Sequence, residues 1–249
     1  MLAVAVPARA ADQPVAAGAG QLTRDLTSED DDVAIAAAKK LGEGGGAAAL
    51  VGGLAMGLRP AVAAEALAAL GKARDPRAVA VLLLYAGNVN APVRLAAVKA
   101  LGQQGDPRAV ELLLERLGDS HPQVRAAAAE ALAARKVTRA TQRLMLLMAR
   151  NDAGAAGPLG ALIAPSAIPQ LAELHGRVDD NVLATALGEF LKRPEVPDRL
   201  RVDVVKTVGR LPGAAATAAL VEYLASVPEK ERRPSKEEAQ RLIDQRGSK

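Results

Sequence analysis

The sequence contains no cysteine, no tryptophan and only two histidines, His121 and His175. The absence of cysteine excludes a thiol nucleophile, and two histidines leave few options for a protein-bound metal ion. His121 stands in a turn before a proline and His175 precedes a glycine, so we interpret both as turn or helix-end residues. We therefore expect no catalytic residue, no metal site and no cofactor.

Aromatic residues are also scarce, since Tyr85, Phe190 and Tyr223 make up the whole set. Base-stacking surfaces and enzymes that extrude a nucleobase depend on aromatic side chains, and the net charge of +4, from 32 basic and 28 acidic residues, is only a mild excess. We therefore expect no nucleic-acid binding. No stretch reaches the roughly 18 apolar residues that a membrane-spanning helix needs, so no membrane span is expected.

A repeat of about thirty residues runs through most of the chain. The pentapeptide Asp-Pro-Arg-Ala-Val occurs at residues 75–79 and again at 106–110, and 106 minus 75 is 31. Copies of a longer register begin at Val33, Val62, Val93 and Val124, the run 200–209 matches 93–102, and Val182 indicates one more copy. A unit of this length must stack on its neighbours to bury its apolar face, which predicts a solenoid.

Each repeat is predicted to form two helices. Asp106 is placed to cap a helix, Pro107 occupies its first position, and apolar residues at helical spacing follow up to Gly118. Pro122 then begins a second helix after a short turn. This pattern predicts an all-α fold, an α-solenoid of about six to seven stacked helix pairs over residues 21–228. Between residues 132 and 182 the pattern degrades, so one unit is expected to be irregular.

The pattern Val-Arg-x-x-Ala-x-x-Ala-Leu-Gly-x-x-Gly-Asp-Pro-Arg-Ala-Val, present as Val93 to Val110, resembles the HEAT repeat of the phycobilisome-lyase-like subclass. The resemblance covers about 21–228 and implies a fold more than a function, because the shared residues are those that make the repeat pack. It implies that the Val-Arg helices line the concave side of the solenoid. Ala63 and Leu183 stand where the arginine would be, so stacking is expected to be less regular there.

The N-terminal segment 1–20 is interpreted either as the remnant of an export signal or as a disordered Ala-rich lead. Residues 2–6 are apolar and Ala8-Arg9-Ala10 has the Ala-x-Ala form that precedes signal cleavage, but a complete signal has an apolar core of about 7–15 residues. With a signal remnant the protein would be periplasmic or secreted. Otherwise it would be cytoplasmic.

The C-terminal segment 229–249 is densely charged and differs from the repeats. The run 235–238, Ser-Lys-Glu-Glu, has the form of a capping box. It predicts a short helix that passes through Leu242 and Ile243, ends near Gly247 and caps the last repeat. A detachable docking helix for a partner is the alternative.

Two further patterns have structural interpretations. The acidic run 29–32 falls at a helix start, where Ser28 can cap the helix and the carboxylates favour the helix dipole, so we interpret it as capping rather than as a calcium site. The glycine clusters 44–46 and 52–53 lack the lysine of a phosphate-binding loop and follow a helix rather than a strand. Both clusters are therefore expected to be connections between helices.

Arg94, Arg125 and Arg201 recur at one position of the repeat. A row of arginines can bind anions, but the resemblance implies that each bonds a neighbouring turn, and Asp119 is a suitable partner for Arg125. We therefore expect these arginines to be structural.

Variable positions on the exposed face of the Val-Arg helices remain for function. The candidate partner-binding residues are Ile35, Lys39, Leu95, Lys99, Glu130, Val202 and Lys206. A shallow, partly apolar surface edged by lysines suits a helix or extended peptide with acidic flanks. We predict a monomeric, non-catalytic scaffold that binds another protein on its concave face. The alternative is a regulatory or chaperone-like accessory subunit of an enzyme, as the lyase-like resemblance implies.

Overall fold

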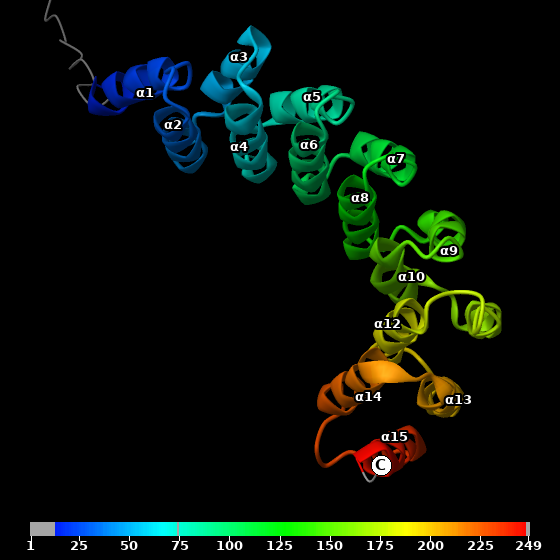
Figure 1. Ribbon diagram of the computed structural model, residues 1–249. Coiled ribbons are helices and arrows are strands. Elements are labelled where there is room, and N and C mark those ends of the chain that lie inside the picture. The colour runs from blue at the N-terminus through cyan, green and yellow to red at the C-terminus, as the bar shows by residue number, and fades with distance from the viewer. Residues whose placement is uncertain (1–12, 74, 248–249) are drawn as a thin grey trace, which may run out of the picture. The chain divides into compact units, whose positions relative to one another are not determined.

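The computed structural model describes residues 13–73 and 75–247, and the regular structure of these residues is entirely helical, as the sequence predicts. The chain begins with α1 (Gln13–Asp25), α2 (Asp31–Glu43), α3 (Ala47–Met56), α4 (Pro60–Lys72), α5 (Pro76–Tyr85), α6 (Ala91–Gln103), α7 (Pro107–Arg116) and α8 (Pro122–Ala134). It continues with η1 (Thr138–Ala140), α9 (Thr141–Met148), η2 (Ala153–Ala155), α10 (Ala156–Leu162), η3 (Pro165–Ala167), α11 (Ile168–Ala172), α12 (Asp180–Leu191), α13 (Asp198–Arg210), α14 (Gly213–Ser226) and α15 (Pro234–Gly247). The fold is an α-solenoid of seven helix pairs followed by α15 (Figure 1).

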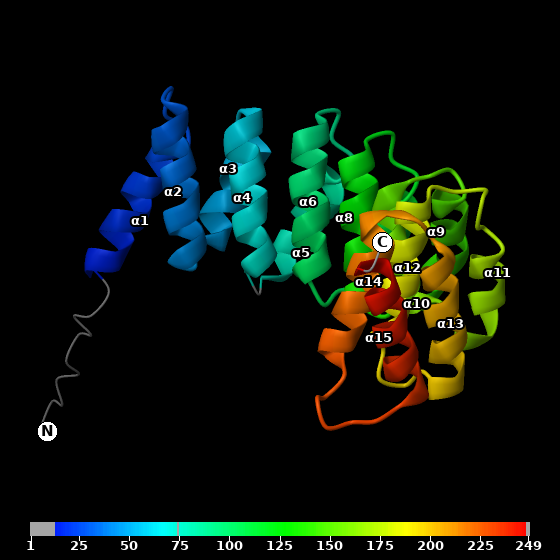
Figure 2. The ribbon, with the colours of Figure 1, turned by 60° about the horizontal axis from the view of Figure 1, so that its bottom comes forward.

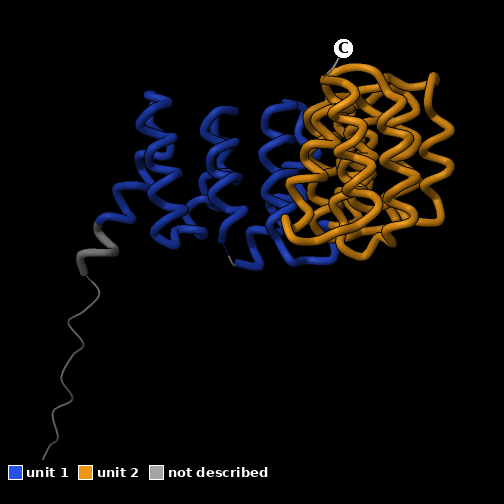
Figure 3. Tube along the Cα trace, turned by 90° about the horizontal axis from the view of Figure 1, so that it is seen from below, with its two compact units in different colours: residues 1–109 blue, residues 110–249 orange. Residues whose placement is uncertain are grey.

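The chain divides into two compact units, Met1–Ala109 and Val110–Lys249, which are coloured separately in Figure 3. The boundary falls inside α7. Each unit is described by itself.

The repeated pentapeptide is a helix start, as predicted. The Oδ1 atom of Asp75 accepts the backbone N–H of Arg77 at 2.9 Å, and the Oδ1 atom of Asp106 accepts that of Arg108 at 2.8 Å. The next residue is a proline in both copies, and its missing N–H costs nothing at the first helical position. The Arg77 guanidinium also bonds the Asp75 carboxylate, which lowers the pKa of that carboxyl group.

In unit 1, helices α2, α4 and α6 lie side by side in one layer, and α1, α3 and α5 form the other layer (Figures 1 and 2). The first layer is closely packed because a glycine of one helix faces an alanine of the next. A Cβ atom placed on Gly71 would lie 2.8 Å from the Cα atom of Ala100, which is closer than side chains approach in proteins. The core consequently consists of small aliphatic side chains such as Ala66, Leu70 and Ala97.

Unit 2 repeats this construction. Helices α8, α10, α12 and α14 stack in one layer, while α9, α13 and α15 belong to the other (Figure 1). A Cβ atom on Gly188 of α12 would lie 2.9 Å from the Cβ atom of Ala219 of α14. The larger buried residues Phe190 and Tyr223 also come from these two helices.

The predicted irregular segment lies between α8 and α12. There α9, α10 and α11 have only 8, 7 and 5 residues, and 3₁₀ turns replace parts of the helices. Two non-glycine residues with positive φ, Lys136 (54°) and Asn151 (61°), turn the chain before α9 and after it. Despite its short helices, the irregular unit contributes α10 to the layer, where α10 packs between α8 and α12.

One prediction about the repeat register is wrong. The run 200–209 matches 93–102 in sequence, which predicts a helix of the same layer as α8, but these residues form α13 in the other layer. Helices α12 and α14 pack on each other instead. Val182 and Leu200 are only 18 residues apart, too few for a complete helix pair, so the two matches cannot both mark the same layer.

The stacking irregularity expected at Ala63 and Leu183 is not observed. Both residues are buried, and helices α4 and α12 each pack on a stacked neighbour at either side. At the start of α4, Arg59 bonds the preceding repeat instead, because it donates from Nη2 to the carbonyl oxygen of Ser28 at 2.5 Å. The same side chain bonds Asp31 Oδ1 from Nε at 2.6 Å.

Two local predictions need correction. Asp30, rather than Ser28, caps α2 and accepts the backbone N–H groups of Asp32 and Val33, although the acidic run does lie at a helix start as expected. The cluster 44–46 does connect α2 to α3, but 52–53 lies inside α3. Gly53 is buried there against Leu26 and Leu58, so it is a packing residue and not a connection.

The ends of the chain depart from the repeats in different ways. Residues 13–20 of the predicted lead belong to α1, whereas the Ala8-Arg9-Ala10 segment lies outside the described residues. The expectations about export and localisation therefore stay predictions. None of the helices among the described residues combines the length and the apolar character that a membrane span requires.

Candidate interaction surface

Four exposed lysines belong to the layer formed by α2, α4 and α6. They are Lys39 and Lys40 on α2, Lys72 on α4 and Lys99 on α6, and all are exposed. Within the described part of the chain, none of the four has a carboxylate oxygen within 4.0 Å. Their charges are therefore available to a partner. We call this surface the lysine face.

Apolar side chains lie among these lysines. Ile35 and Leu95 are half-buried, so each leaves part of its side chain accessible, while the intervening α4 contributes only small residues such as Ala64 and Ala68. A hollow of about 90 Å³ between α2 and α4 is lined by Lys39, Gly42, Glu43, Glu65, Ala68, Ala69 and Lys72. The structure thus brings Lys39 together with Lys72 and Glu65. The repeat count missed these two residues because it took Ala68 from α4, whereas Glu65 lies three residues before Ala68 and Lys72 four residues after it.

Among the described residues of unit 1, the arginines differ from the lysines because they are engaged within the protein. Arg59 bonds Asp31, Arg77 bonds Asp75, and Arg108 bonds Asp106. Arg94 donates from Nη1 to the carbonyl oxygens of Asn88 and Val89, at 2.9 and 3.1 Å. Arginine suits such fixed positions since its planar group reaches several acceptors at once.

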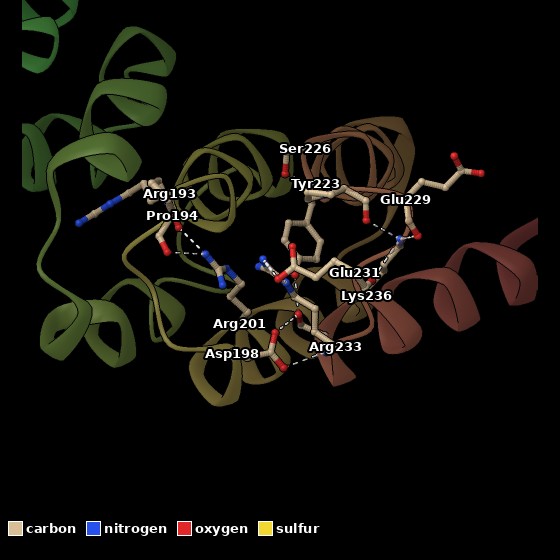
Figure 4. Close-up of polar contacts among 12 residues, drawn as sticks. Arg193, Pro194, Asp198, Arg201, Tyr223, Ser226, Glu229, Glu231, Arg233 and Lys236 are labelled. Carbon is tan, nitrogen blue, oxygen red and sulfur yellow. Dashed lines mark hydrogen bonds and ion pairs between the residues drawn. The ribbon is translucent and has the colours of Figure 1, made fainter.

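The predicted structural role of the recurring arginines is confirmed in unit 2 as well. Arg125 donates from Nη1 to the backbone oxygen of Asp119 at 2.9 Å, and its Nε lies 2.5 Å from Oδ2 of Asp152. Asp152 caps η2, so this pair ties α8 to the start of the next unit. Arg201 is only 5% exposed and donates to the carbonyl oxygen of Leu191. It also donates to those of Arg193 and Pro194 (Figure 4).

A hollow of about 680 Å³ lies beside the Arg125–Asp152 pair in unit 2. Three of its polar lining side chains are engaged within the protein: Asp152 holds Arg125, and the side chain of Asn151 accepts the backbone N–H of Asp179 at 2.7 Å. These bonds supply partners for the polar side chains in the turn between α9 and η2. It does not form a constellation of nucleophile, base and acid.

The remaining candidate partner-binding residues are separated by the layers of unit 2. Glu130 is exposed on α8, whereas Val202 and Lys206 lie on α13 in the other layer. Lys206 stands near α15, where its charge helps to lower the pKa of Glu238, after the larger effect of the hydrogen bond from Arg241. Lys206 therefore faces the C-terminal helix.

A buried polar cluster fixes α15 to α13 and α14 (Figure 4). The hydroxyl group of Ser235 is fully buried between the hydroxyl group of Tyr223 and the carboxylate of Asp198. Lys236 donates to the backbone oxygens of Pro228 and Glu229, at 3.1 and 2.9 Å, and so holds the preceding loop. The predicted helix through Leu242 and Ile243 to Gly247 is confirmed, but the capping box is wrong. Ser235 is the second residue of α15 rather than its cap, and its N–H donates to the carboxylate of Asp198.

The two histidines occupy the turn positions that the sequence predicts. The backbone N–H of His121 donates to Oδ1 of Asp119 at 2.9 Å, and Nδ1 of His175 lies 3.6 Å from Oδ1 of Asp180. In the described residues, no group of three or more histidine, aspartate or glutamate side chains is arranged to hold a metal ion.

Comparison with known families agrees with this helix-pair architecture. The model of HEAT repeats matches residues 48–133 and 85–156. HEAT repeats are thus recognised within residues 48–156. The matched range includes both copies of the Asp-Pro-Arg-Ala-Val sequence, so the HEAT resemblance inferred from Val93 to Val110 is confirmed.

Several solved structures are similar to this chain. One is the complex of CpcE and CpcF of phycocyanin lyase from Nostoc sp. PCC7120, with 20% identity, a TM-score of 0.48 and coverage of 98% of this chain and 99% of that chain. An engineered protein has 20% identity, a TM-score of 0.44 and coverage of 92% and 72%. A designed armadillo repeat protein has 18% identity, a TM-score of 0.39 and coverage of 90% and 98%. No curated protein matches the chain.

Proposed function

We propose that this HEAT-repeat protein is a non-catalytic scaffold that binds an acidic segment of another protein on the lysine face of unit 1. The observation that carries the proposal is the set of four exposed lysines without carboxylate partners, on three helices packed side by side. The described arginines of the same unit are bonded internally, so the lysines supply the positive charge that is free to act outward.

The contacts of such a segment follow from the arrangement of the face. Ile35 and Leu95 offer apolar surface on the two outer helices of the layer, and Lys39 and Lys99 stand one helical turn beyond them. The backbone groups in the middle of a helix bond within the helix, so recognition has to come from side chains. A peptide with leucines spaced between glutamates matches this pattern. Val202 and Lys206 lie on α13 and take no part.

The test is the affinity of a fluorescent peptide that alternates leucine with glutamate, measured by anisotropy. We expect the double variant Lys39→Glu and Lys99→Glu to bind about tenfold more weakly, because two favourable charge pairs become repulsive. Lys206→Glu is the matched control and should bind like the unmodified protein. Equal binding by all three proteins would refute the lysine face, and a loss with Lys206→Glu alone would move the site to α13.

We also propose that the protein is a monomer, which sedimentation velocity can establish directly. The accessory-subunit alternative requires an enzyme that binds the same chain. A stable complex whose partner has an enzymatic activity that the scaffold changes would favour that alternative over a simple scaffold.

A further inference from the structure

Close packing within the stacked layers depends on a glycine of one helix that faces an alanine of the next. A Cβ atom on Gly42 of α2 would lie 2.6 Å from the Cβ atom of Ala69 of α4, and one on Gly188 of α12 would lie 2.9 Å from that of Ala219 of α14. The junction of α4 and α6 described above is of the same kind. Each of these junctions therefore needs one partner without a side chain and one with only a methyl group.

The two contacts of a stacked helix lie two residues apart. In α4, Ala69 meets α2 and Gly71 meets α6. In α12, Ala186 meets Gly160 of α10, and Gly188 meets α14. Residues two positions apart lie roughly 200° apart around a helix and so on opposite sides of it. Alanine thus marks the side towards the preceding helix, and the glycine two residues later marks the side towards the next.

This spacing identifies the residues at the open ends of the two layers. In α14, Ala219 meets α12, so the position for a following helix is that of Val221, which is 48% exposed. In α2, Gly42 meets α4, so the position for a preceding helix is that of Lys40, which is also exposed. Neither end therefore has the small residue that the internal junctions use.

The rest of both open sides would suit stacking. The other exposed residues at helical spacing around Val221 of α14 are small and apolar, namely Ala214, Ala218 and Ala225. On α2, the exposed Val33 and Ala36 lie on the same side as Lys40. Lys40 and Val221 are therefore the residues that obstruct a junction of the internal kind.

The obstruction has two physical causes. At the spacing of the internal junctions even one additional Cβ atom is too close to the next helix, so the methyl groups of Val221 would force the two helices apart. The side chain of Lys40 would bring a charge into an apolar junction, which is strongly unfavourable. A second copy of the chain therefore cannot stack its α2 on α14 as closely as α14 stacks on α12.

We infer that Lys40 and Val221 prevent copies of this chain from stacking end to end, with α2 of one copy on α14 of the next. Such a contact joins two different surfaces, so it would link copies into an open chain or a ring. The inference rests on the proposed monomer and names the two residues that maintain it. It also accounts for the accessibility of α2, which contributes Lys39 and Lys40 to the lysine face.

The double variant Lys40→Ala and Val221→Gly introduces the internal pattern at both ends. We expect its weight-average mass, measured by sedimentation equilibrium, to rise about twofold or more between about 10 and 300 µM, while the unmodified protein stays monomeric. Lys39→Ala with Val221→Gly is the matched control, because Lys39 is exposed beside Lys40 but lies one residue away from the required position. The control should stay monomeric.

The outcomes separate this inference from the proposed function. A double variant that stays monomeric would overturn the inference and leave peptide binding on the lysine face unaffected. Association of the unmodified protein would refute both the inference and the proposed monomer. Circular dichroism checks that each variant keeps its helices. If glycine weakens α14, Val221→Ala with Lys40→Ala is the second variant, since alanine favours helices more than glycine does, and it should also associate.

Cross-linking identifies the surfaces that meet, because the chain has no cysteine of its own. Ala36→Cys and Ala218→Cys place thiols on the open sides of α2 and α14. Added to the double variant, they should give a ladder of disulfide-linked copies on a non-reducing gel after mild oxidation. The same two cysteines in the otherwise unmodified protein should give about fivefold less of the linked product. Equal ladders would overturn the role of Lys40 and Val221.

Discussion

The carboxylate of Asp198 on α13 accepts the backbone N–H of Ser235 at 3.3 Å and also bonds its hydroxyl group, so one helix supplies the cap of another. The N–H groups in the first turn of a helix have no partner inside the helix. Here the partner comes from a residue 37 positions earlier in the chain, and the bond joins α15 to the last helix pair.

Loss of the Ser235 hydroxyl group should destabilise unit 2. Ser235→Ala removes one partner of the buried Tyr223 hydroxyl group and one partner of Asp198, which we expect to cost about 1–3 kcal/mol of the free energy of unfolding. Ser166→Ala is the control, because Ser166 is exposed, and it should change stability by less than about 0.5 kcal/mol. Urea unfolding followed by circular dichroism measures both. Equal stability of the two variants would show that the cluster contributes nothing.

Glycine-to-alanine changes in neighbouring helices of unit 1 should have opposite effects. At Gly71 the new Cβ atom would lie 2.8 Å from backbone Cα of Ala100, so α4 and α6 must move apart, at an expected cost of about 1–3 kcal/mol. At Gly52 nothing lies within 4 Å, and alanine should stabilise α3 by about 0.5–1 kcal/mol. Thermal unfolding of both variants tests the signs. A stabilised Gly71→Ala would contradict the close contact between α4 and α6.

Tyr85 should make stability depend on alkaline pH. Burial raises the pKa of its phenol above the ordinary value of about 10, because the charged form is poorly solvated. Its contribution is therefore complete below about pH 10 and is lost as the pH rises through the raised pKa. Tyr85→Phe should cost about 1 kcal/mol at pH 7, where the bond to Leu54 is lost, and should flatten the alkaline decline. The measurement is the urea midpoint between pH 8 and 11. An unchanged decline in the variant would assign it to other groups.

Much of the architecture could be read from the sequence because the repeat is encoded locally. Asp106 and Pro107 start a helix by chemistry that extends over three residues, and Gly71 with its counterparts marks where helices approach closely. The bonds of Arg94 and Arg125 to their own preceding turns span five or six residues, which is also within reach of a repeat pattern.

The candidate surface was only partly predictable. The repeat count found Lys39 and Lys99, which the structure places on helices flanking α4, but it missed Lys72 because the count considers only two positions per helix. It also assigned Val202 and Lys206 to the wrong layer. The position of a residue in the repeat pattern does not specify which layer its helix joins when a unit of irregular length comes before that helix.

By itself, the sequence determined the helix pairs, their period, their capping residues and the small side chains that let helices stack, because each depends on residues a few positions apart. Only the tertiary structure decided which layer α13 occupies, which carboxylate caps α15 and which exposed side chains lack partners. These features depend on burial and on contacts between residues about thirty positions apart, which are settled when the whole unit packs.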